Sequence, residues 1–122
     1  MCDKSLVIEE LQKIEETIVH ILGRTENILS ANDFVLTPWG VDMLDVACIR
    51  LEAIGETLKK LDKHSNGQIF SNYSTIPWKK IMRMRDIVAH HYFEVDFEIV
   101  FKIIKEDLRP LLDVIRKMQQ DV

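Results

Sequence analysis

Apolar residues recur with a helical period along the first quarter of the chain, with charged and polar residues between them. A helix over residues 4–30 would carry these apolar positions on one face, as a helix packed on a core does. The polar cluster at residues 30–33 breaks the pattern. We therefore expect one long amphipathic helix over about residues 4–30. Its core positions are Val7, Leu11, Ile14, Ile18, Ile21, Leu22, Ile28 and Leu29.

A second helix is predicted from Thr37 and Pro38, because threonine caps helix N-termini and proline is tolerated in the first turn. It should end before the turn-forming residues 64–67. Gly55 falls on the apolar stripe, so either another helix or a ligand approaches it closely or it is a tolerated small residue. The predicted stripe is Val41, Leu44, Ala47, Cys48, Leu51, Ile54, Gly55, Leu58 and Leu61.

Two further helices follow a polar loop. Residues 75–78 predict the start of a third helix that runs to about His91, with Trp78, Ile81, Met84 and Val88 as its apolar stripe. Asp96 is the expected N-cap of a fourth helix, which Pro110 should kink or split in two. The inward positions of this fourth helix are Phe97, Val100, Phe101, Ile104, Leu108, Leu111, Leu112 and Ile115.

Four helices with connections of ordinary length predict an all-α, up-and-down four-helix bundle with antiparallel neighbours. A chain of 122 residues suits a single domain over residues 1–122.

Cys2 and Cys48 lie far apart and are expected to be reduced thiols. The chain lacks the start of a signal peptide and a stretch of ~18 apolar residues that could cross a membrane. We therefore expect a cytoplasmic protein with no membrane segment.

The formal net charge of −4 is unevenly distributed. Between Trp78 and Tyr92, four basic residues and one aspartate sum to +3, so the rest of the chain carries −7. A basic segment of this kind is either a solvated helix face or a surface that holds phosphates.

The third helix also holds the candidate chemistry, because the sequence has no glycine-rich phosphate loop, Cys-x-x-Cys pair or zinc helix. On an ideal helix Arg85 and Tyr92 project onto the same stripe as Ile81 and Val88. An arginine on an apolar face must find a carboxylate, line a cleft or meet a subunit interface.

Asp86 and His90 are four residues apart and project onto the opposite face, where the carboxylate could orient the imidazole. Arg85 and His90 project about 140° apart, so one helix cannot easily aim both at one atom. Either the helix unwinds near His90, or a second copy of the chain completes the site across a two-fold axis. His90 and His91 make a poor metal site, because consecutive helical residues diverge and no further ligands converge.

At Arg85, Asp86 and His90 the sequence resembles the HEPN superfamily, whose signature is an arginine, a polar residue and a histidine four to six residues after the arginine. The closer resemblance is to the HepT-like branch, in which a tyrosine follows the motif histidine with one residue between them, as Tyr92 follows His90. The resemblance extends through residues 47–56 and through the Ile-Pro-Trp block at residues 76–78 to Asp96.

The resemblance implies a helical bundle that dimerises through its motif helices and cleaves RNA without a metal ion or cofactor. It further implies a toxin, whose neighbouring gene encodes a minimal nucleotidyltransferase antitoxin. That partner would neutralise the toxin by transferring AMP to Tyr92.

The catalytic residues expected from this resemblance are Arg85, His90 and Asp86. His90 would act as general base or acid, Arg85 would stabilise the phosphate, and Asp86 would orient one of them. Two alternatives remain. The chain could be a non-catalytic nucleotide-binding or scaffolding partner of a nucleotidyltransferase, or only a structural helical dimer with Arg85 in a buried ion pair.

Overall fold

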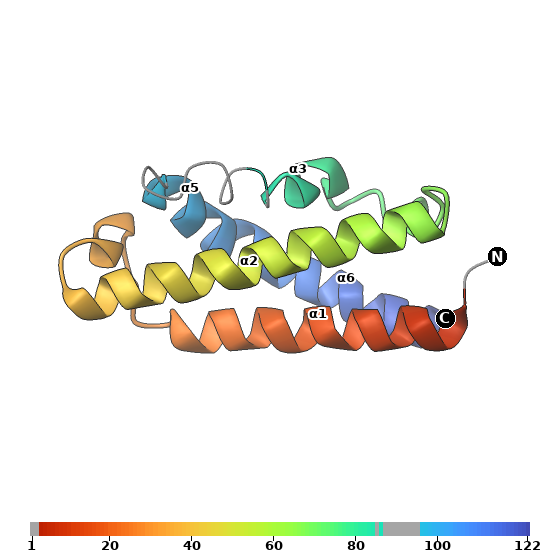
Figure 1. The fold of residues 1–122 in the computed structure, drawn as a ribbon, viewed down its shortest axis with the longest axis horizontal. Helices are drawn as coiled ribbons and strands as arrows, with labels where there is room; N and C mark the ends of the chain where they lie inside the picture. The colour runs from red at the N-terminus through yellow and green to blue at the C-terminus, as the bar shows by residue number, and fades with distance from the viewer. Residues whose placement is uncertain (1–2, 85, 87–95) are drawn as a thin grey trace.

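The computed structural model describes residues 3–84, residue 86 and residues 96–122, and this part of the chain contains helices and no strand. Figure 1 shows α1 and α2 running antiparallel, with α3 over the second half of α2 and α6 returning along α1. The predicted all-α bundle is therefore confirmed. The α-helices are α1 (Lys4–Arg24), α2 (Pro38–His64), α3 (Trp78–Met82), α5 (Phe97–Lys102) and α6 (Leu108–Asp121).

Helix α1 ends at Arg24, six residues earlier than predicted. The hydroxyl of Thr25 donates to the Ile21 carbonyl, and the chain then turns with the N–H of Ile28 bonded to the Thr25 carbonyl. This turn buries Ile28 without a helix, whereas Leu29 is 79% exposed. The placement of Leu29 in the core was wrong, because the apolar period continued past the last turn of the helix.

Helix α2 begins as predicted, with the Thr37 hydroxyl accepting from the N–H of Gly40 and Pro38 in the first turn. It ends at His64. Figure 1 shows that its first turns project beyond the end of α1. This overhang explains why Val41, which the stripe placed in the core, is 42% exposed. From Ala47 onward the predicted stripe is buried.

The overhanging end of α2 packs on a short 3₁₀ turn, η1 (Ala31–Phe34). The Asp33 carboxylate accepts from the N–H groups of Leu29 and Ser30, and Phe34 is fully buried. Gly40 lies directly against this turn, since a Cβ built on it would overlap the Asp33 carbonyl oxygen. A side chain at position 40 would therefore separate α2 from η1.

The predicted interruption of the fourth helix is present, and it lies just ahead of Pro110. Helix α5, capped by the Asp96 side chain as expected, passes into a π-helical turn, Ile103–Asp107, before α6 begins. In this turn the N–H of Leu108 donates to the Ile103 carbonyl. Pro110 then stands in the first turn of α6, where its missing N–H and bulky ring cost least.

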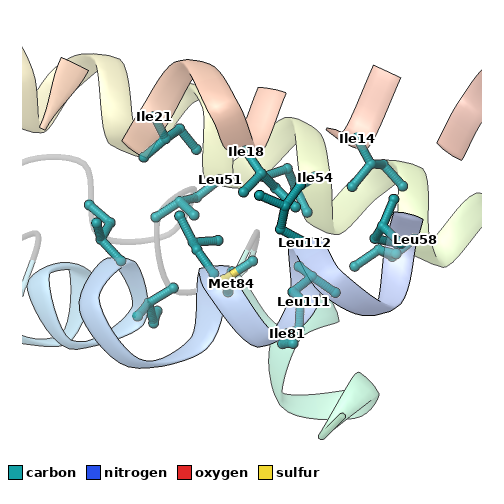
Figure 2. Close-up of a cluster of buried hydrophobic side chains, with 14 of the residues drawn as sticks. Ile14, Ile18, Ile21, Leu51, Ile54, Leu58, Ile81, Met84, Leu111 and Leu112 are labelled. Atoms are coloured by element: carbon teal, nitrogen blue, oxygen red, sulfur yellow. The ribbon is translucent and has the colours of Figure 1, made fainter. Parts of the chain in front are cut away.

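The core consists of apolar side chains from every helix of the described part. Figure 2 shows Ile14 and Ile18 of α1 above the α2 residues Leu51 and Ile54, with Met84 and Leu111 below them. Burying each such side chain contributes about 1.5–3 kcal/mol. The apolar stripes of the predicted helices therefore meet in one cluster.

A polar contact fastens α6 to α1 at the edge of this core. The Glu15 carboxylate accepts from Arg116 Nε at 2.9 Å and from Gln119 Nε2 at 2.8 Å. The hydrogen bond from Arg116, followed by that from Gln119, holds the pKa of Glu15 below its usual value. Both partners stabilise the ionised carboxylate.

None of the described helices is long and apolar enough to cross a membrane.

Gly40→Ala should destabilise the protein by about 1–3 kcal/mol, because the clash with the Asp33 carbonyl outweighs the better helix propensity of alanine. The matched control is Gly23→Ala, whose added Cβ meets nothing within 4 Å and which should stabilise α1 by up to about 1 kcal/mol. Urea unfolding followed by circular dichroism measures both changes. A higher unfolding midpoint for both variants would contradict the close approach.

Glu15→Gln should lower the free energy of unfolding at pH 7 by about 0.5–1 kcal/mol, because the contact is partly exposed. The folded pKa of Glu15 is depressed, so this contribution is complete above the ordinary value of 4.5 and is lost as pH falls through the folded pKa. Urea unfolding of wild type and variant should therefore converge in acid. The neighbouring Glu16→Gln variant is the control, and a difference that persisted unchanged at low pH would contradict this assignment.

Candidate functional site

The loop before α3 holds in place the start of the predicted third helix, whose described part (α3, Met84 and Asp86) is called the motif helix below. Trp78, the first residue of α3, stacks on Phe70 with ring centroids 4.1 Å apart, and its Nε1 donates to the Tyr73 carbonyl at 2.8 Å. The Tyr73 hydroxyl in turn donates to Asp121 at 2.6 Å, which raises the pKa of Tyr73 to about 12. The loop is thus tied to both α3 and the end of α6.

Two apolar side chains fasten the motif helix to the bundle. Ile81 and Met84 are 1% and 2% exposed, and Figure 2 shows both within the core cluster. They confirm the described part of the predicted stripe. Arg83 ends α3, and Met84 and Asp86 are again helical.

Asp86 lies on the solvent side of this segment, as predicted. Its carboxylate is 46% exposed, and Lys59 Nζ from α2 approaches Asp86 Oδ2 to 3.8 Å. Lys59 was not among the predicted site residues. The position of Lys59 in the sequence gave no indication that it lies near Asp86. Only the packing of α3 on α2 brings the two side chains together.

The other predicted site residues, Arg85, His90 and Tyr92, lie outside the described residues, as does His91. The expected pairing of Asp86 with His90 therefore stays a prediction. The same holds for the shared face of Arg85 and Tyr92 and for the predicted composite site between two copies.

A second ion pair joins α3 to the π-helical turn. Lys80 Nζ lies 3.4 Å from Asp107 Oδ2, and the Asp107 side chain is only 18% exposed. Lys79 and Arg83, like Lys80, are exposed. The described basic residues of the positively charged window therefore lie on the surface of the motif helix, while its apolar side faces the core.

The buried thiol of Cys48 is not suited to nucleophilic chemistry. Desolvation, followed by the nearby charges of Asp45 and Glu52, raises the pKa of Cys48 to about 11. The thiol is therefore protonated at neutral pH. It is free, as the sequence predicted, and Cys2 lies outside the described residues.

Within the described residues, no group of three His, Cys, Asp or Glu side chains could hold a metal ion.

Comparison with known proteins assigns the chain to a family. The Ribonuclease HepT-like family model matches residues 8–118, which include all four predicted site residues. A protein of Caldanaerobacter subterraneus subsp. tengcongensis named "Putative RNase" is 33% identical over 111 residues, 90% of this chain and 88% of that protein. A "Probable ribonuclease HepT" of Thermococcus cleftensis is 34% identical over 70 residues, 57% of this chain and 60% of that protein.

A longer protein of Methanocaldococcus jannaschii, named "Gamma-glutamylcyclotransferase and putative RNase", is 28% identical over 116 residues. The match covers 95% of this chain and 46% of that protein, so the chain spans less than half of its relative. No solved structure matches the chain significantly. These findings confirm the family and the ribonuclease class that the motif predicted. The chain belongs to the Ribonuclease HepT-like family.

Proposed function

We propose that this protein is a metal-independent endoribonuclease that acts as the toxin of a toxin–antitoxin pair. The observation that carries the proposal is the family match over residues 8–118, which spans the whole Arg85 to Tyr92 motif. The exposed basic residues beside the motif, Lys79, Lys80 and Arg83, support a polyanionic substrate.

The proposed reaction is attack of a ribose 2′-hydroxyl on the adjacent phosphate. A base removes the 2′-hydroxyl proton, the 2′-oxygen bonds to phosphorus, and the bond from phosphorus to the 5′-oxygen breaks as that oxygen gains a proton. His90 is the proposed base or acid, and Arg85 stabilises the negative charge on the phosphate. Asp86 would orient one of them. The products are a cyclic phosphate and a 5′-hydroxyl end.

A dimer completes the proposed site. On one ideal helix Arg85 and His90 point about 140° apart, so two motif helices across a two-fold axis would bring an arginine and a histidine to the same phosphate. A second copy would also double the local positive charge, which offsets the net charge of −4 on each chain.

The proposed neutralisation is AMP transfer to Tyr92 by a minimal nucleotidyltransferase. The phenolic oxygen of Tyr92 would bond to the α-phosphorus of ATP, and pyrophosphate would leave. The product is a bulky, negatively charged group two residues from His90. It would block the RNA sterically and repel its phosphates.

Removing either proposed catalytic side chain should greatly slow the cleavage of RNA, measured in excess chelator. His90→Ala should lose roughly 10²- to 10⁴-fold in rate, because proton transfer in the transition state contributes about that much. Arg85→Ala should lose a comparable factor. Incubation of the purified variants with total RNA, followed by mapping of the cut ends, measures the losses.

The matched control is Arg24→Ala, which removes the same charge from the exposed last residue of α1. It should cleave at the wild-type rate. If wild type, His90→Ala and Arg85→Ala all cleave equally, the mechanism is wrong. If none cleaves while the chain still binds nucleotide, the non-catalytic binding partner becomes the better reading.

Coexpression with a nucleotidyltransferase encoded beside this gene should add one adenylate to Tyr92. Intact mass would rise by one AMP, and tandem mass spectrometry should place it on Tyr92. The modified protein should lose its cleavage activity. Tyr92→Phe should stay unmodified and Tyr73→Phe should be modified normally, so adenylate on a different residue would refute the assignment.

A further inference from the structure

The end of α2 carries four basic residues, and three of them have a structural explanation. Lys60 lies 3.3 Å from the nearly buried carboxylate of Glu10 on α1. Lys63 and His64 occupy the last turn of α2, where positive groups stabilise the partial negative charge of the helix end. Lys59 lies outside this last turn and points toward the motif helix instead.

The contact of Lys59 with the motif is open to solvent. Lys59 Nζ lies 3.8 Å from Asp86 Oδ2, and the two side chains are 43% and 46% exposed. An exposed pair at this distance contributes little to stability. An ammonium has three donors, so Lys59 can face Asp86 and still bind a second anion from solvent.

The charge of the motif gives this position a consequence for the substrate. Arg85 and Asp86 are adjacent in the chain and cancel formally, so the pair alone does not attract a phosphate. Lys59 makes the group of three residues positive. Its ammonium lies 3.8 Å from Asp86 Oδ2, the one carboxylate of the basic window, and so reduces the repulsion between this carboxylate and an RNA phosphate.

We propose that Lys59 is an RNA-binding residue of the site, which holds a backbone phosphate beside the motif while Asp86 keeps its ammonium in place. This inference rests on the proposed ribonuclease function. It makes the binding surface a product of two segments that packing brings together, the end of α2 and the segment around Asp86.

The test compares Lys59→Gln, Lys59→Arg and Lys63→Gln in cleavage of a short single-stranded RNA at several salt concentrations. Lys59→Gln should raise KM about tenfold with kcat nearly unchanged, because one charged contact to the bound substrate is lost. Its slope of log KM against log salt should fall by about 0.7, the value of one phosphate contact on a single strand. Lys59→Arg should restore both values, and Lys63→Gln should stay within about twofold of wild type.

Affinity for the same RNA with every 2′-hydroxyl methylated separates this inference from the proposed function, since that RNA cannot be cleaved. If wild type fails to cleave any RNA, the proposed function falls, and the methylated RNA still decides the role of Lys59. Weaker binding by Lys59→Gln alone supports the inference. Equal binding by Lys59→Gln and wild type overturns it, and so does an equal loss in Lys63→Gln, which would indicate unspecific attraction.

Discussion

The burial of Ile81 and Met84 decides how the segment that leads into the motif lies on the bundle. These two side chains pack into the cluster formed by α1, α2 and α6, and each contributes about 1.5–3 kcal/mol through the apolar surface it removes from water. With this side of the segment held in the core, Lys79 and Arg83 are turned to solvent and Asp86 lies half-exposed. The exposure of these charged side chains therefore depends on an apolar contact on the other side of the segment.

Two departures from a regular α-helix shape the bundle around its core. At one end, Gly40 lets η1 lie directly on the first turn of α2, which a side chain would prevent. Elsewhere, the π-helical turn before Pro110 carries Asp107, whose carboxylate meets Lys80 on α3. A turn of this kind accommodates a proline without ending the helix altogether. In this protein it also places an acidic partner next to the motif helix.

Charged side chains in this protein either join helices to one another or lie on the surface near the motif. Glu10 and Glu15 join helices at the edges of the core through Lys60, Arg116 and Gln119. The described basic residues of the motif window, Lys79, Lys80 and Arg83, lie at the surface. Lys59 of α2 adds a further ammonium beside Asp86. A chain with a net charge of −4 can in this way present a locally positive surface to a polyanion, because screening in salt confines each charge to about 10 Å.

The helical period, the Thr37 and Asp96 caps and Pro110 were enough to predict the bundle, because each acts through neighbours in the chain. The motif spacing was likewise enough to predict the family. The predicted end of α1 near residue 30 was wrong, because Ile28 is buried by a turn after the helix and not by the helix itself. Gly40 against Asp33 and Lys59 beside Asp86 were beyond prediction, because each joins residues from different elements. Local pattern determines helices, whereas only tertiary packing decides which side chains from separate helices meet.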